Sequence, residues 1–149
     1  EPCDVGVLLD QTLGEYGEKL NAAGLEPVLT KPEKPVIIMA DGRHMWRIFD
    51  NLLNNICKYS QRGTRVYLEV CERDGKAVVT FRNISSRQLN ISSDELMERF
   101  VRGDSSRNTE GSGLGLNIAQ SLAQLQKGTM ELTVDGDLFK VTLTFDVVK

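Results

Sequence analysis

Two pairs of strand-like segments, each interrupted by an Asp-Gly dipeptide, constrain the fold of this chain most strongly. The first pair covers residues 65–72 and 76–81, and the second covers residues 129–134 and 138–147. All four are rich in β-branched, aromatic or other apolar side chains. Asp-Gly between such runs favours a tight hairpin, because these residues tolerate a positive φ. Two predicted hairpins would supply most of a β-sheet.

The remaining regular segments have mostly helical spacing. Residues 4–23, residues 41–59 and residues 114–126 are each predicted to form a helix, the first capped by an aspartate and ended by Gly24. Residues 25–39 carry three prolines between short apolar runs, which indicates two short edge strands around a turn. The middle helix has a broad predicted core stripe made of Met45, Ile48, Phe49, Leu52, Leu53 and Ile56.

The order of these elements favours one architecture. A helix, two strands, a helix and a hairpin are followed by a loop with a short helical piece at 94–100, then a helix and the second hairpin. We expect an α/β fold, a two-layer α/β sandwich in which helices cover one face of a mixed sheet. The 149 residues, of which 40% are hydrophobic, suit one domain over residues 1–149 with one core.

Composition excludes several classes of function. The formal net charge of −3 gives no general attraction to nucleic acid or to anionic lipid, so neither is expected as a partner. No apolar run approaches the roughly 20 residues that cross a bilayer. Cys3, Cys57 and Cys71 lack CxxC spacing and stand with a single histidine, which disfavours a zinc cluster. We interpret them as reduced thiols in a cytosolic piece of a longer protein.

A polar stripe runs along the middle predicted helix, opposite its core stripe. Asn51 and Asn55 are four residues apart, and Lys58 follows three residues later on the same face. Amide oxygens can ligate Mg²⁺ and an ammonium group can meet a phosphate oxygen. The stripe could therefore hold a metal–triphosphate group, or it could be a solvated polar face.

A second candidate site is the glycine-rich run Gly111-Ser-Gly113-Leu114-Gly115-Leu116, which leads into the last predicted helix. Glycines let backbone N–H groups approach a phosphate, and a helix N-terminus favours negative charge. The run is neither a P-loop nor a dinucleotide-binding fingerprint, because no Gly-Lys-Ser/Thr follows and no strand leads into it. Alone it is weak evidence, since many turns are rich in glycine.

Together these motifs resemble, in residues and in order, the ATP-binding domain of sensor histidine kinases, which has the Bergerat (GHKL) fold. The resemblance covers nearly the whole chain. It rests on an N box, on an F box with its lid, and on a G2 box, which are Asn51-Leu-Leu-x-Asn55-x-x-Lys58-Tyr59-Ser60, Glu98-Arg99-Phe100-x-Arg102 with Asp104-Ser-Ser-Arg107, and Gly111-Ser-Gly-Leu-Gly-Leu116.

The resemblance implies the cofactors ATP and Mg²⁺ and a role for each motif. Asn55 would ligate Mg²⁺, Asn51 would lie near the phosphates, and Lys58 and Arg102 would contact phosphate oxygens. Tyr59 would pack beside the nucleotide. The glycine-rich run, Gly111, Gly113, Leu114, Gly115 and Leu116, would cradle the triphosphate, and residues 103–109 would form a mobile lid.

One motif departs from the family pattern. The family has Asp-x-Gly-x-Gly after its third strand, where the aspartate accepts a hydrogen bond from the adenine amino group. Here Asn83 takes the position of that aspartate, and Ser85 and Arg87 replace the glycines. The Asn83 amide oxygen can still accept the bond, although a neutral acceptor is weaker than a carboxylate.

His44, the single histidine, follows Asp41 by three residues. It lacks the acidic neighbour and the following proline of the family's phosphoacceptor helix, so we interpret it as a surface helix residue. Trp46 is interpreted as a partly buried packing residue. The phosphorylated histidine is therefore expected on an upstream helical domain that is not in this sequence.

The resemblance implies half of an ATP-dependent protein-histidine kinase of a two-component system. The domain would hold Mg²⁺–ATP and donate the γ-phosphate to a histidine on a separate, dimeric phosphoacceptor domain, which would then phosphorylate a response regulator. It would be a cytoplasmic domain of a membrane-anchored parent. Two alternatives stay open, a regulatory docking module with weak ATP affinity and a hydrolysing GHKL ATPase, although Asn51 stands where that ATPase has its glutamate.

Overall fold

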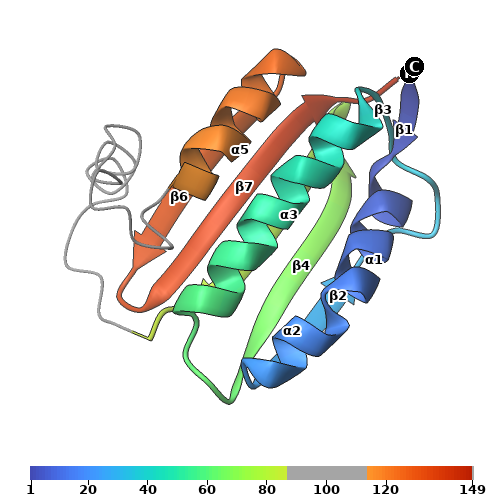
Figure 1. Cartoon of the computed structure of the whole chain (residues 1–149). Coiled ribbons are helices and arrows are strands. Elements are labelled where there is room, and N and C mark those ends of the chain that lie inside the picture. The colour runs from blue at the N-terminus through green and yellow to red at the C-terminus, as the bar shows by residue number, and fades with distance from the viewer. Residues whose placement is uncertain (87–113, 149) are drawn as a thin grey trace.

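A computed structural model describes residues 1–86 and 114–148 of the chain as two packed layers (Figure 1). One layer is a five-stranded sheet with the strand order β2 (Leu25–Thr30), β4 (Thr64–Arg73), β5 (Lys76–Ile84), β7 (Leu138–Asp146) and β6 (Thr129–Asp135). The other is made of α1 (Val5–Glu15), α2 (Gly17–Ala22), α3 (Gly42–Tyr59) and α5 (Leu114–Leu125). The helices lie on one face of the sheet, which confirms the predicted two-layer sandwich.

Both predicted hairpins are present. Strands β4 and β5 pair antiparallel up to the residues that flank Asp74 and Gly75, whose φ angles are 53° and 77°. Those two positive values are what a two-residue type I′ turn requires. Gly136, with φ of 61°, occupies the equivalent turn between β6 and β7. The sheet is mixed because β2 joins it parallel to β4, whereas its other pairs are antiparallel.

Helix α3 matches its prediction at both ends. Asp41 caps its start, where the carboxylate accepts a hydrogen bond from the Arg43 N–H at 2.9 Å. Its buried residues are the six of the predicted core stripe. Phe49 from this stripe packs against Phe81 of β5, with 5.8 Å between the ring centres. Helix α3 thus lies with its apolar face on the middle of the sheet.

The N-terminal segment differs from its prediction. The expected single helix over residues 4–23 is interrupted at Tyr16, which separates α1 from α2. The buried Tyr16 hydroxyl donates to the backbone oxygen of Asp50 on α3 at 3.0 Å and also to the Asp50 carboxylate. Gly14 and Gly17 flank the break, and glycine is a poor helix former. A tertiary contact therefore overrides a helical pattern.

Residues 25–39 form two short strands as predicted, but these strands belong to different sheets. Strand β2 is an edge strand of the main sheet, while β3 (Ile37–Met39) pairs antiparallel with β1 (Pro2–Asp4) in a separate two-stranded sheet. Strand β1 was not predicted from the sequence. Its three residues are too few to show a period, and the pairing partner of Pro2 is Met39, 37 residues away in the sequence.

All three cysteines are free thiols, as predicted. Burial raises the pKa of both the Cys3 and the Cys57 thiol, which makes them poor nucleophiles. Among the described helices, none combines the length and the hydropathy of a membrane-spanning segment. The predicted helical piece at 94–100 and the predicted lid at 103–109 lie outside the described residues.

Candidate functional site

Two of the predicted motifs lie at the same end of the helix layer. Helices α3 and α5 pack against each other and run antiparallel, so the C-terminal end of α3 lies beside the N-terminal end of α5 (Figure 1). Asn51 and Asn55 are half-buried on α3 and Lys58 is exposed. Leu114, Gly115 and Leu116 begin α5, and Leu116 is buried.

The remaining predicted contacts from the lid and the glycine-rich run cannot be placed on this end. Arg102, Gly111 and Gly113 lie outside the described residues. The described portion of the candidate site therefore consists of the C-terminal half of α3, the start of α5 and the strand end beneath them.

Asn51 has an unusual environment. Its side-chain Nδ2 is buried and has no hydrogen-bond partner within the described part of the chain. A buried N–H donor without an acceptor costs about 1–3 kcal/mol of folding free energy, so native proteins rarely keep one without a reason. An acceptor from a ligand, such as a phosphate oxygen, would satisfy it. Among the described residues, Asn51 thus marks a position where a polar ligand could supply a hydrogen-bond acceptor.

Asn83 is the last residue of the core-facing stripe of β5. Ala77, Val79 and Phe81 alternate along the strand and are buried against the helices, and Asn83 continues this face with only 5% of its surface exposed. Its Nδ2 donates to the Ser60 hydroxyl oxygen at 2.8 Å. This bond uses the donor end of the amide, whereas adenine recognition would use the acceptor end.

The segment after β5 is joined to the end of α3 by backbone hydrogen bonds. The Gln61 N–H donates to the Ile84 oxygen at 2.7 Å, and the Ser86 N–H donates to the Tyr59 oxygen at 2.8 Å. Asn83 and the end of the N box, predicted separately from the sequence, are therefore brought together. No role was predicted for Ser60, because its contact with Asn83 joins residues 23 positions apart.

Tyr59 borders this end of the helix with 38% of its surface exposed. Partial burial raises the pKa of its phenol, so the ring stays neutral at physiological pH. A neutral, half-exposed aromatic ring is suited to pack against a planar base. Lys58 next to it is exposed and can reach an anion from the solvent side.

A metal site at this end would depend on few protein groups. No group of three or more His, Cys, Asp or Glu side chains that could hold a metal ion occurs within residues 1–86 and 114–148. The Asn55 amide oxygen is a hard, neutral ligand of the type that Mg²⁺ accepts. Mg²⁺ commonly takes one or two protein ligands and completes its octahedron with water and substrate phosphates. Asn55 fits that chemistry together with a triphosphate.

His44 lies at the opposite end of α3. At 1.5 Å per residue, the 11 residues from His44 to Asn55 span about 16 Å. The imidazole is half-buried, and its Nδ1 lies 3.9 Å from the Asp41 carboxylate and 2.9 Å from the Gln126 amide. His44 is therefore held by neighbours and lies away from the candidate site. Trp46 is half-buried in the same helix.

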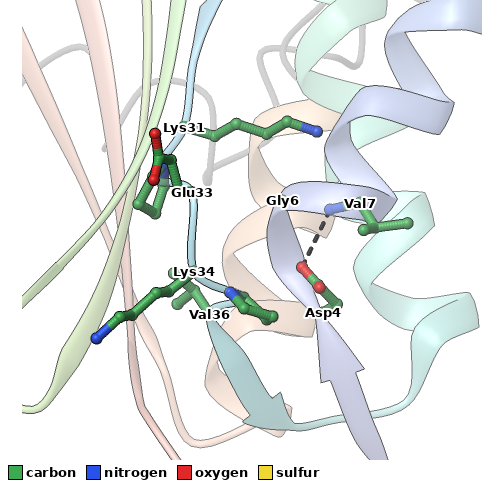
Figure 2. Close-up of a pocket in the computed structure, with 9 residues that line it drawn as sticks. Asp4, Gly6, Val7, Lys31, Glu33, Lys34 and Val36 are labelled. Carbon is green, nitrogen blue, oxygen red and sulfur yellow. Dashed lines mark hydrogen bonds between the residues drawn. The ribbon is translucent and has the colours of Figure 1, made fainter.

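The structure also has a half-open hollow of about 230 Å³ between the start of α1 and residues 31–36. Figure 2 shows that the Asp4 carboxylate there caps α1 by accepting a hydrogen bond from the Val7 N–H, at 3.2 Å. Lys31 extends toward the same helix and pairs with Asp10 at 3.3 Å. None of the predicted site residues lines this hollow, so it is separate from the candidate site.

Comparison with known proteins identifies the family. Residues 40–149 match the model of the histidine kinase-, DNA gyrase B- and HSP90-like ATPases. The chain therefore belongs to this ATPase family. Within the family it is related to sensor histidine kinases, which confirms the resemblance stated from the sequence motifs.

Two relatives from Escherichia coli illustrate this relationship. The probable sensor protein PcoS is 38% identical over 115 residues, which are 74% of this chain and 24% of the relative. The signal transduction histidine-protein kinase BaeS is 29% identical over 153 residues, covering 92% of this chain and 32% of the relative. The chain thus spans about a quarter to a third of these curated relatives.

Solved structures support the fold. The catalytic domain of histidine kinase ThkA in a nucleotide-free form has a TM-score of 0.84 at 15% identity, with 98% of this chain and 94% of that chain covered. The mycobacterial sensor histidine kinase MprB has a TM-score of 0.79 at 22% identity, with 99% and 97% covered. The mixed sheet with helices on one face is the Bergerat fold of histidine kinase catalytic domains.

Proposed function

We propose that residues 1–149 form one domain that binds Mg²⁺–ATP and donates the γ-phosphate to a histidine on a separate phosphoacceptor domain. That partner would be a dimeric helical domain of the same kinase, and it would pass the phosphoryl group to a response regulator. The domain would work in the cytoplasm, attached to a parent protein anchored in the membrane. The family match and the sensor-kinase relatives support this proposal.

The observation that carries the proposal is the buried Asn51 donor without a partner in the described residues. It lies one helical turn from Asn55, on the face of α3 that also carries Lys58. An acceptor-rich group with negative charge would satisfy the amide and pair with the ammonium. A triphosphate provides both properties.

Each residue of the site would have a distinct task. Asn55 would ligate Mg²⁺, which when bound supplies charge neutralisation of the phosphates. Lys58 and Arg102 would pair with phosphate oxygens. The backbone of the run from Gly111 through Gly113, Leu114, Gly115 and Leu116 would cradle the triphosphate at the start of α5.

The nucleoside would lie toward the strand end. Tyr59 would pack beside it, and the Asn83 amide oxygen would accept a hydrogen bond from the adenine amino group. Catalysis by these residues would consist of holding the γ-phosphate in place and stabilising its charge, since the attacking imidazole belongs to the partner domain.

Calorimetric titration with ATP in the presence and absence of Mg²⁺ tests the proposal. We expect Mg²⁺-dependent binding by the wild-type domain and loss of its Mg²⁺-dependent part in the variant Asn55→Ala. Asn54→Ala, which changes the half-buried neighbour, is the matched control. An absence of binding at millimolar nucleotide would favour the regulatory docking module instead.

Phosphorylation provides a second test. The domain alone should neither phosphorylate itself nor hydrolyse ATP rapidly, because His44 lies at the wrong end of α3 and Asn51 cannot act as a general base. Incubation with labelled ATP should leave the protein unlabelled. Stable label that disappears in His44→Gln would contradict the assignment of His44, and rapid hydrolysis would favour the hydrolysing ATPase.

A further inference from the structure

Gln126, the residue after α5, connects the end of this helix to the start of α3. Its side-chain Oε1 accepts a hydrogen bond from the Asp41 N–H at 2.8 Å. Its Nε2 lies 2.9 Å from His44 Nδ1. Asp41 is the N-cap of α3, so both bonds reach the first turn of the N-box helix. We refer to these two contacts as the Gln126 clamp.

The chain around Gln126 fixes the position of the clamp. The Gly128 N–H donates to the Ala123 oxygen at 2.8 Å and the Lys127 N–H donates to the Gln124 oxygen at 2.9 Å, the pair of bonds that defines a Schellman motif. Lys127 accordingly has a left-handed φ of 65°. The chain therefore makes a well-defined corner, held by hydrogen bonds, at the C-terminal end of α5.

Gly128 anchors this corner to the sheet. A Cβ atom at this residue would lie 2.4 Å from the Phe145 ring and 2.7 Å from the Thr144 oxygen of β7. Only glycine lets the backbone approach β7 so closely. The clamp thus joins α3 to a point of α5 that is already held on the sheet.

The Gln126 clamp and the candidate nucleotide site lie at opposite ends of the same two helices (Figure 1). At 1.5 Å per residue, Asn55 is about 21 Å from Asp41 along α3, and Gly115 is about 17 Å from Gln126 along α5. Each helix is continuous over this length, 18 residues in α3 and 12 in α5. A change in the spacing of the helices at the clamp therefore changes their spacing where the nucleotide would lie.

We propose that Gln126 is a positioning residue, which sets the spacing between the N-box helix and the glycine-rich start of α5 and thereby the affinity for ATP. The inference rests on the proposed function of the site. It adds a residue that no sequence motif of the site includes, because Gln126 lies outside the N, F and G2 boxes.

The chemistry of the clamp fixes the direction of both hydrogen bonds. Since Oε1 accepts the Asp41 N–H, the group that faces His44 is the NH₂, which can only donate. The Gln126 NH₂ therefore donates to the ring nitrogen Nδ1 of His44. The charged groups beside the imidazole in the described residues are the Asp41 carboxylate at 3.9 Å and Arg43, which pairs with that carboxylate at 3.6 Å.

The test measures the ATP affinity of the whole domain with Mg²⁺ at pH 8. Gln126→Met keeps the length of the side chain and removes both bonds. Gln126→Glu keeps the acceptor for the Asp41 N–H and removes the NH₂ that faces His44. Gln124→Met, an exposed change in the same helix, is the control. Thermal unfolding is recorded on the same samples.

We expect ATP to bind about three- to tenfold more weakly to Gln126→Met than to the wild type, with a smaller loss in Gln126→Glu, which keeps the bond from the Asp41 N–H, while Gln124→Met matches the wild type. A structural role alone would lower the unfolding temperature and leave the ATP affinity of the folded variants at the wild-type value, which would overturn the inference. If the wild type binds no ATP, both the proposed function and the inference fail. If the wild type binds ATP and the Gln126 variants bind it equally well, only the inference fails.

Discussion

The two ends of helix α3 differ in whether their polar groups have hydrogen-bond partners. At the N-terminal end, the Asp41 carboxylate caps the helix, the Asp41 N–H donates to Gln126, and His44 meets the same glutamine. At the C-terminal half, the buried Asn51 Nδ2 lacks a hydrogen-bond partner within the described residues. At the N-terminal end the protein itself supplies the hydrogen-bond partners. At the C-terminal half one buried donor has no partner among the described residues.

This difference separates stability from function along a single helix. Hydrogen bonds at the completed end contribute to folding, whereas an unsatisfied donor at the other end costs folding free energy unless a ligand binds. Proteins keep such costs where activity requires them. The apolar stripe between the two ends holds the helix in place for both purposes.

The largest expected effect comes from that apolar stripe. Phe49→Ala removes a fully buried ring that packs on Phe81, so we expect a loss of about 3–5 kcal/mol in the free energy of unfolding. Urea unfolding followed by circular dichroism measures it, with the exposed Arg47→Ala as the control. A loss below that of Arg47→Ala would show that α3 is not held by this face.

Asn83 gives the next largest effect, on binding. If Asn83 binds adenine as proposed, Asn83→Ala would leave the adenine amino group without an acceptor, so ATP affinity should fall by about five- to a hundredfold, or 1–3 kcal/mol. Ser60→Ala removes only the contact that orients the Asn83 amide and should have a smaller effect. Calorimetric titration measures both variants. An unchanged affinity in Asn83→Ala would mean that this position does not contact the base.

Asn51→Ala should have opposite effects on the stability of the domain and on its affinity for ATP. Removing the unsatisfied donor should leave the free energy of unfolding unchanged or raise it by up to about 1 kcal/mol, while ATP affinity falls about tenfold. Urea unfolding and titration of the same samples measure the two. A variant that is destabilised yet binds ATP normally would place Asn51 among the structural residues.

The smallest effect tests the corner at the end of α5. Lys127 occupies a left-handed conformation that costs a non-glycine residue about 1–2 kcal/mol, partly offset by the greater entropy that glycine loses on folding. Lys127→Gly should therefore raise the free energy of unfolding by about 0.5 kcal/mol. Lys127→Ala retains the strain and is the control. A destabilised Lys127→Gly would contradict the Schellman geometry.

Local patterns predicted much of this fold. The apolar period fixed the buried face of α3, and the Asp-Gly dipeptides predicted both hairpins, since turns and amphipathic faces depend on neighbouring residues. The break at Tyr16 was missed because it depends on Asp50, 34 residues away. The spacing of apolar residues in a helix carries no information about such a long-range contact.

Only part of the candidate site was predicted, because its other contacts are also long-range. The motifs indicated Asn51, Asn55 and Asn83, but not the bond between Asn83 and Ser60, which requires the end of β5 to lie beneath the end of α3. The bond between Gln126 and Asp41 joins residues 85 positions apart and was likewise invisible in the sequence. These contacts follow from the fold.

The most direct test of the account compares ATP with GTP on the wild-type domain and on Asn83→Asp, with Mg²⁺ present. GTP has a carbonyl where ATP has its amino group, so it cannot donate to the Asn83 oxygen. We predict tighter binding of ATP than of GTP by both proteins, and ATP affinity in Asn83→Asp at or above the wild-type value, because a carboxylate is the stronger acceptor and the Ser60 hydroxyl can donate to it. Equal affinities for ATP and GTP in the wild type would contradict the claim that this end of the sheet recognises adenine.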